Sequence, residues 1–380
     1  MQVPLDTPVQ VRAEKFRGVL DDERAAAYRV LQESGAILEE AEAPPVRSPR
    51  LAEGGRSLVA LARGRDRAEA IRLAADLLGG FGRAVDPPGP VLLKPNFNSA
   101  DPFPASTHPD HLQTVIDLLR EAGCAEIAVG EMGGLLSLPA KENFERWGMP
   151  AFGEKNGLEV LRFDEEPWVR AHAPGAVRWG GWVHCIERLL RPGQHVVNLP
   201  TMKSHGGGPR FSLSLKNVYG FVHPRDRVRA HFVPQMAEMI IETNLLYTPS
   251  LIVLDGTKCW ISGGPYTGEE RAPNLIIAGD DRIAVDVAGA AVLRFMGAEL
   301  MQGYPVWSHR QIRRAVALGL GACGPEEVAL RFADATGSAD FPDLEEKVRA
   351  LVAEGDPGPG GAGNGRPVSA EFVDEGGGMG

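Results

Sequence analysis

The sequence predicts an α/β protein with two interlocked lobes around a mostly parallel sheet. Short apolar segments alternate with amphipathic helical segments through residues 56–330, and several of the apolar segments run directly into polar loops. Uninterrupted apolar strands are typical of parallel sheets that are buried on both faces. With 380 residues, of which 43% are hydrophobic, the chain is long enough to bury a large core.

We divide the chain into four parts by pattern and composition. Residues 1–55 are expected to form an N-terminal helical arm and linker, and residues 56–330 the α/β body. A C-terminal helix region follows at 331–354, and the glycine- and proline-rich residues 355–380 are expected to be a flexible tail. The arm either packs against the body or is exchanged between subunits of a homo-oligomer.

The first part of the body reads as strand, helix and strand, at residues 58–62, 66–78 and 90–93. This order predicts a βαβ unit. The second strand ends at a proline, which lacks the amide hydrogen needed to continue the ladder. Three polar side chains therefore lie at the carboxyl end of a strand: Lys94, Asn96 and Asn98.

The alternation continues beyond this unit. Ser106 or Thr107 is expected to cap a helix over residues 108–122, and a strand over 126–130 ends at Glu131. The tryptophan-rich residues 168–185 are interpreted as an insertion or an antiparallel elaboration.

Residues 196–220 are the stretch around which we expect the function to be organised. A short apolar strand leads into a loop that contains Lys203, His205, three glycines, Lys216 and Asn217. Ligands of open α/β sheets usually bind where strands end in such loops. If residues 211–216 are extended, Ser214 and Lys216 share one face of the strand.

The second half of the body repeats the alternation of strands and helices. A helix is expected over residues 234–246, a strand over 251–254 that ends at Asp255, and another strand over 275–278. Asp280 or Asp281 is expected to cap the next helix, which runs to Phe295. A further helix is expected over residues 308–318.

Charge and cysteine content narrow the functional classes. The net charge of −10 argues against a nucleic-acid or anionic-membrane footprint. The four cysteines are far apart and make no C-x-x-C motif, so we expect no cysteine-ligated iron–sulfur cluster. Reduced thiols, the absence of a signal-like N-terminus and the absence of a long apolar run predict a cytoplasmic protein outside the membrane.

Four motifs occur in one order along the body: VLLKPN at 91–96, NLPTMKSH at 198–205, SLKN at 214–217 with Gly220, and GDD at 279–281 with AVD at 284–286. With them, roughly residues 57–300 resemble the domain-of-unknown-function 362 family. That family has no established reaction. Many of its members append a ferredoxin-like module with iron–sulfur clusters, and this chain lacks the necessary cysteines. The layout is also similar to that of lactate-racemase-type proteins, which hold an anionic nucleotide-derived cofactor between two α/β domains.

The candidate site residues are chosen for their chemistry. Lysines at strand ends suit a carboxylate or phosphate, and a histidine with a pKa of ~6.5 suits proton transfer near neutral pH. The three glycines form either an anion-binding turn or a flexible lid. We expect His205 and Lys203 to be catalytic, and the ligand to be bound by Lys94, Asn96, Asn98, Lys216, Asn217, Ser214 and Gly207.

Four carboxylates are expected to support this site: Glu131, Asp255, Asp281 and Asp286. Glu131 and Asp255 end predicted strands, whereas Asp281 is best explained as a helix cap. Asp286 lies within an apolar helix, where it either pairs with a site lysine or faces solvent. No compact metal motif is present, although His108, His223 and His231 leave a divalent metal site open.

Two functions fit these residues. The first is an enzyme that acts on a small anionic metabolite by proton or group transfer assisted by lysine and histidine. The second is a non-catalytic module that binds an anionic ligand or cofactor for a partner protein. In both cases the expected partner is a small anionic molecule, with no nucleic acid and no membrane.

Overall fold

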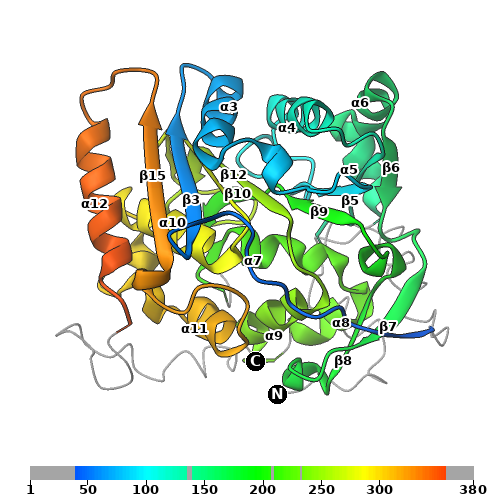
Figure 1. Cartoon of the computed structure of the whole chain (residues 1–380). Helices are drawn as coiled ribbons and strands as arrows, with labels where there is room; N and C mark the ends of the chain where they lie inside the picture. Colours follow the sequence, from blue (N-terminus) through cyan, green and yellow to red (C-terminus); the bar gives the residue numbers. More distant parts are fainter. Residues whose placement is uncertain (1–38, 135–138, 207–208, 232, 357–380) are drawn as a thin grey trace, which may run out of the picture.

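A 12-stranded mixed sheet is the central feature of the computed structural model, which describes residues 39–134, 139–206, 209–231 and 233–356. In spatial order, the strands on its main path are β15 (Val328–Asp334), β3 (Arg56–Arg63), β14 (Leu275–Gly279), β12 (Leu251–Trp260), β9 (His195–Asn198), β4 (Val91–Lys94), β5 (Ile127–Glu131) and β6 (Glu159–Arg162) (Figure 1). Four short strands pair beside this path: β2 (Ala52–Glu53), β10 (Thr201–Ser204), β11 (Phe211–Ser212) and β13 (Glu270–Arg271).

The sheet confirms the predicted α/β class. On the main path every neighbouring pair is parallel except the two that β14 makes with β3 and β12. The two lobes expected from the sequence share this one sheet. The first predicted unit differs in topology, because β14, β12 and β9 separate β3 from β4.

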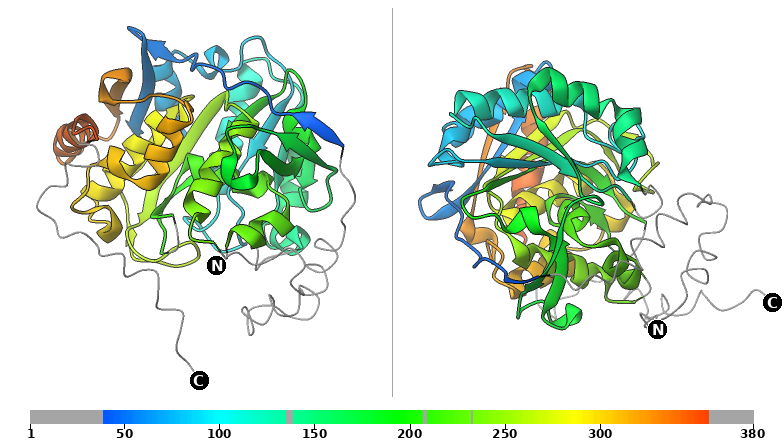
Figure 2. Two further views of the ribbon diagram at one scale, coloured as in Figure 1. Left: turned by 90° about the horizontal axis from the view of Figure 1, so that it is seen from below. Right: turned by 90° about the vertical axis from the view of Figure 1, so that its right-hand side faces the viewer.

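Helices cover both faces of the sheet (Figures 1 and 2). One face carries α3 (Arg67–Leu78), α4 (Pro109–Glu121), α5 (Ala140–Trp147) and α6 (Met149–Asn156). The other face carries α7 (Ser214–Asn217), α8 (Pro224–Ala230), α9 (Met236–Glu242), α10 (Arg282–Phe295), α11 (Arg310–Ala317) and α12 (Phe341–Ala353).

Strand β4 shows why its sequence is apolar without alternation. Val91 and Leu93 pack against the α3 and α4 side, whereas Leu92 packs against the opposite side. All three side chains are almost completely buried. Burial of each such side chain contributes about 1.5–3 kcal/mol. The strand is therefore held from both faces, and its polar residues are found only where it ends.

A small three-stranded sheet contains β1 (Glu40–Glu42), β7 (Trp168–His172) and β8 (Trp182–Ile186). The antiparallel pairing of β7 with β8 confirms the predicted elaboration at 168–185. Of the expected arm and linker, the structure describes residues 39–55, which are mostly the predicted linker and contain the short strands β1 and β2. The remainder of the expected arm, residues 1–38, lies outside the described residues, as do residues 357–380 of the expected tail.

One predicted helix cap and one predicted strand end are wrong for identifiable reasons. Ser106 and Thr107 do not cap α4, because their hydroxyl groups donate to backbone oxygens of Ser99 and Leu199. His108 caps the helix instead, with Nδ1 accepting from the amide of Asp110 at 3.1 Å. Strand β12 continues past residue 254 to Trp260, since β10 and β13 supply further pairing partners.

The C-terminal part of the body extends beyond the expected boundary at residue 330. Strand β15 crosses this boundary and pairs with β3 along its whole length. The predicted C-terminal helix is present as α12. The segment before β3 is also attached to the body, because the amides of Arg50 and Leu51 donate to Asp280 Oδ2 at 2.5 and 3.1 Å.

Residues 211–216 are not one extended strand. Only Phe211 and Ser212 are extended, and α7 begins at Ser214. The cause is Asp286 on α10, which accepts from the Ser214 amide at 2.8 Å, the Ser214 hydroxyl at 2.5 Å and the Leu215 amide at 3.0 Å. Asp286 is fully buried, so it neither faces solvent nor pairs with a site lysine, and burial raises its pKa to about 7.

Replacing Asp286 tests this connection between α10 and α7. Asp286→Ala leaves two buried amides without acceptors, and we expect it to lower the free energy of unfolding by about 2–4 kcal/mol. Urea denaturation gives the measurement. Asp286→Asn retains one accepting oxygen and should therefore lose less unfolding free energy. Asp76→Ala, on the exposed surface of α3, is the control. A loss for Asp286→Ala within about 0.5 kcal/mol of the control would contradict this role.

Candidate functional site

A cavity of about 220 Å³ opens where β4, β5 and β10 end. It is lined by most of the residues selected from the sequence, which are Asn96, Asn98, Glu131, Lys203, His205, Lys216 and Asn217. These residues come from four separate parts of the chain. The parallel sheet brings them together because the carboxyl ends of its strands lie along one edge.

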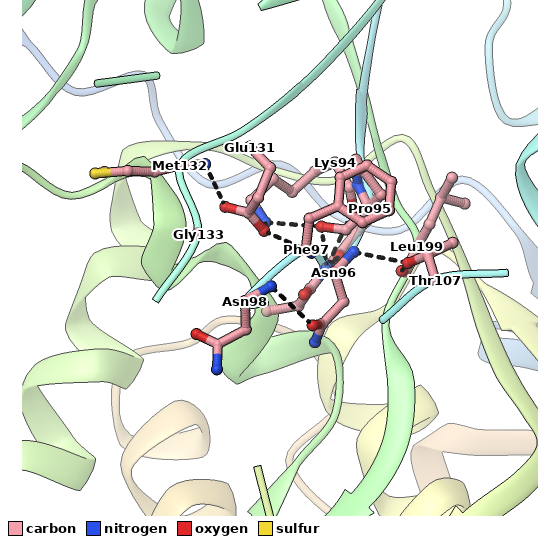
Figure 3. Close-up of polar contacts among 12 residues, drawn as sticks. Lys94, Pro95, Asn96, Phe97, Asn98, Thr107, Glu131, Met132, Gly133 and Leu199 are labelled. Carbon is pink, nitrogen blue, oxygen red and sulfur yellow. Dashed lines mark hydrogen bonds and ion pairs between the residues drawn. The ribbon is translucent and has the colours of Figure 1, made fainter. Parts of the chain in front are cut away.

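A buried ion pair forms the base of this cavity (Figure 3). Lys94 Nζ donates to Glu131 Oε2 and, at 2.9 Å, to the carbonyl oxygen of Pro95. The other oxygen of Glu131 accepts from the amide of Met132 at 2.8 Å. Burial lowers the pKa of Lys94, and the charge of Glu131 opposes this shift. Lys94 is fully buried and lies beneath the cavity, so its side chain does not line the space for a ligand.

Gly220 crosses directly over the ion pair. A Cβ atom at this position would lie 2.0 Å from Glu131 Oε1 and 3.1 Å from Lys94 Cε. Any larger residue would displace the carboxylate. The glycine of the SLKN motif region is therefore required by close packing of the 3₁₀ helix η5 (Val218–Phe221) over β4 and β5.

Asparagine residues hold the backbone segments around the buried ion pair in place. Asn217 Nδ2 donates to the carbonyl oxygen of Lys94 at 3.1 Å and to Asn198 Oδ1 at 2.8 Å. The amide of Asn96 donates to Thr107 Oγ1 at 2.7 Å. These bonds connect the ends of β4 and β9 to α7, so the polar ends of the strands are held in one arrangement.

Lys203 is buried beside the cavity without a carboxylate as its hydrogen-bond acceptor. Its Nζ donates to the carbonyl oxygen of Ala105 at 2.6 Å and lies 5.7 Å from the ring centroid of Trp260. Burial, together with the positive charge of Lys216, holds the pKa of Lys203 well below its usual range. The neutral form of this amine is therefore favoured more than it is for a lysine in water.

Lys216 and Arg227 supply positive charge to the cavity. Burial lowers the pKa of Lys216 to about 8, with a further contribution from the charge of Arg227. Lys216 therefore remains mostly protonated at pH 7. The guanidinium of Arg227 donates to the carbonyl oxygen of Gly133 at 2.9 Å and stacks 5.4 Å from the ring centroid of Tyr219.

Two histidines line the same space. Burial, followed by the charges of Lys216 and Lys203, holds the pKa of His205 well below its usual range. Burial also lowers the pKa of His231 to about 4, and its Nδ1 is 2.6 Å from the carbonyl oxygen of Arg227. Both imidazoles are thus neutral at physiological pH. Lys203 and His205, two residues apart, both line the cavity.

The charges around this cavity are unbalanced. Among the described lining residues, Glu131 is the one carboxylate, and Lys94 already pairs with it. The lining cations Lys216 and Arg227 have no such partner among the ion pairs of the described chain. An anion in the cavity would complete this arrangement.

Several predicted site residues lie elsewhere. Ser214 is held by Asp286 and does not line the cavity, and Asp281 caps α10 by accepting from Ile283 and Ala284. Asp255 lies within β12, 2.7 Å from Arg67 Nε. Burial alone would raise the pKa of Asp255, but His111 and Arg67 outweigh it and lower this pKa to about 2. Gly207 lies outside the described residues.

Arg227 and Tyr266 were not selected from the sequence. Arg227 belongs to a charged run, which usually forms a solvated helix face, and Tyr266 lies in a loop without a motif. Tertiary contacts place both residues at the cavity. Helix α8 carries Arg227, which bonds to Gly133, and the neighbouring Gly134 lies close to Asn98 and Tyr266. His231 is named in the sequence analysis as a possible metal ligand.

The histidines proposed as metal ligands have other positions. His108 and His223 cap α4 and α8. In the described ranges, no group of three or more histidine, cysteine, aspartate or glutamate side chains is arranged to hold a metal ion. No helix in the same ranges is long and apolar enough to cross a membrane.

Comparison with known proteins gives a family but no activity. The chain is 27% identical over 240 residues to a thylakoid-associated protein of Synechocystis, covering 59% of this chain and 69% of that protein. No solved structure matches the chain significantly. The model of the family described as Domain of unknown function (DUF362) matches residues 91–291. This match spans more than half of the chain and every described residue that lines the cavity, and the chain therefore belongs to the DUF362 family.

Proposed function

We propose that the chain is an enzyme that acts on a small anionic metabolite, bearing a carboxylate or phosphate, by proton or group transfer. The observation that carries this proposal is the charge imbalance in the cavity. Lys216 and Arg227 line it, while its described carboxylate, Glu131, is already paired with Lys94. A ligand with one or two negative charges would compensate the two cations.

The lowered pKa of Lys216 supports an anionic ligand. Burial removes water from the ammonium group, and Arg227 repels it. The protonated form is therefore less stable than it would be in water. A bound carboxylate or phosphate would reverse this effect by charge-assisted hydrogen bonding, which contributes roughly 1.5–3 kcal/mol per contact.

His205 is proposed as the group that transfers a proton. Its imidazole is neutral, and it lies on the same side of the β10 segment as Lys203. A bound anion would raise the low pKa of His205 by partly cancelling the charges of Lys216 and Lys203. The histidine could then accept a proton from the ligand, as a general base does.

Loss of the Lys216 charge should remove anion binding without unfolding the protein. For Lys216→Met we expect affinity for small carboxylates and phosphates to fall about 10- to 100-fold. Thermal shift with a panel of these anions gives the measurement, because stabilisation grows with ligand concentration relative to Kd.

Lys141→Met is the matched control, since Lys141 is exposed on α5 and does not line the cavity. Without ligand, Lys216→Met should melt no lower than wild type, because the change removes a poorly solvated charge. Equal anion responses of Lys216→Met and wild type would contradict the assignment.

Anion affinity should also depend on pH. Because burial lowers the pKa of Lys216 to about 8, the side chain is charged below this pH and neutral above it. Kd should be nearly constant from pH 6.5 to the pKa, and should then rise by up to about tenfold per pH unit. Calorimetric titration across this range is the measurement.

Lys216→Arg provides the control for this profile, since arginine stays protonated throughout. Its Kd should remain flat at high pH. If wild type and Lys216→Arg show the same profile, Lys216 is not the titrating group.

Proton transfer can be tested before the natural substrate is known. Each anion that stabilises the protein is incubated with it in D₂O, and exchange of carbon-bound hydrogen is followed by proton NMR. We expect exchange for at least one ligand, and His205→Gln should slow it by roughly 10² or more with little change in Kd. His172→Gln, on β7, is the control.

Binding without exchange or turnover would instead support a non-catalytic ligand-binding module. Full exchange by His205→Gln would assign the proton transfer to another group.

A further inference from the structure

Lys203 differs from the two other lysines near the cavity in the groups that surround its amine. Lys94 pairs with Glu131, and Lys216 is partly exposed and mostly protonated at pH 7. Lys203 is 1% exposed, and in the described part of the chain no carboxylate lies within ion-pairing distance of its Nζ. It nevertheless lines the cavity.

The surroundings of this amine favour a nucleophile over a simple positive charge. It is buried, and the charge of Lys216 opposes its protonation, which together oppose the cation–π attraction of the Trp260 ring 5.7 Å away. In the neutral form of the amine, the hydrogen bond to the carbonyl oxygen of Ala105 uses one N–H and leaves the nitrogen lone pair available. Desolvation and a neighbouring cation are the two ways in which proteins activate lysine for attack on carbonyl carbon.

We propose that Lys203 forms an imine with the carbonyl carbon of a small 2-oxo acid held in the cavity. The proposal rests on the anionic site argued above and specifies its substrate class. The nitrogen lone pair attacks the carbonyl carbon, and the amine gives up its two protons to the carbonyl oxygen. That oxygen leaves as water when the C=N bond forms. The step is neither an oxidation nor a reduction, so it needs no further reactant.

The cavity suits the carboxylate of such a molecule. Lys216, with a pKa of about 8, is mostly protonated at pH 7. Together with the guanidinium of Arg227 it can bind the carboxylate, while the Lys203 amine attacks the adjacent carbonyl carbon. A volume of about 220 Å³ is small for a ligand cavity and suits a metabolite of a few carbon atoms. A protonated imine withdraws electrons from the neighbouring carbon, which would make its hydrogen accessible to His205.

Reductive trapping tests this proposal directly. The full chain is incubated at pH 7 with pyruvate and cyanoborohydride, which reduces an imine to a stable secondary amine. Intact mass measures the adduct, and peptide mapping locates it. We expect Lys203 to be labelled at least about tenfold more than any other lysine, because an ordinary lysine with a pKa of ~10.4 is less than ~0.1% neutral at pH 7.

Three controls accompany this measurement. Lys203→Arg should lose the adduct, whereas Lys141→Arg on the exposed surface of α5 should retain it. Lactate has the carboxylate without the carbonyl, so it should compete with pyruvate and slow trapping without forming an adduct. If Lys203→Arg does not fold, the peptide map of the wild-type protein still decides the question.

The outcomes separate the imine from the anion site. If pyruvate or another anion raises the melting temperature but no adduct forms on Lys203, the imine is overturned and anion binding stands. Labelling spread evenly over surface lysines also overturns it. If no anion of the panel binds and no adduct forms, both proposals fail.

Discussion

The buried ion pair between Lys94 and Glu131 is the constraint on which the architecture of the cavity depends. It connects the ends of β4 and β5, and η5 can pass above it because Gly220 has no side chain. Removing one member of such a pair typically costs about 3–5 kcal/mol, since the other charge remains buried without a partner. The pair also neutralises the carboxylate nearest to the cavity, and the remaining cations are left available to an external anion.

Burial gives chemically similar side chains different protonation states at one site. The pKa of Lys216 is lowered to about 8, so its charge survives at pH 7, whereas the pKa of Lys203 is lowered well below its usual range. The histidines are neutral for the same reason. Two lysines in one cavity therefore differ in how strongly they hold a proton, because their burial and their distances from other cations differ.

A buried polar network outside the cavity connects it to the core. Asp286 on α10 accepts from the residues that begin α7, and α7 carries Lys216 and Asn217. Asn217 in turn bonds to the end of β4. The position of Lys216 is thus coupled to the packing of α10 against the sheet, which involves fully buried apolar residues.

The sequence by itself determined the α/β class, most element positions and the convergence of Lys203, His205, Asn96 and Lys216, because apolar segments followed by polar residues mark the carboxyl ends of buried parallel strands. Only the tertiary structure decided which lysine pairs with Glu131, why Asp286 serves α7, and that Arg227 reaches the cavity. Such contacts join residues that are distant in the chain, and local patterns carry no information about the distance between their side chains. Strand periodicity suggested an extended segment at 211–216, but three hydrogen bonds to Asp286 outweighed that local preference.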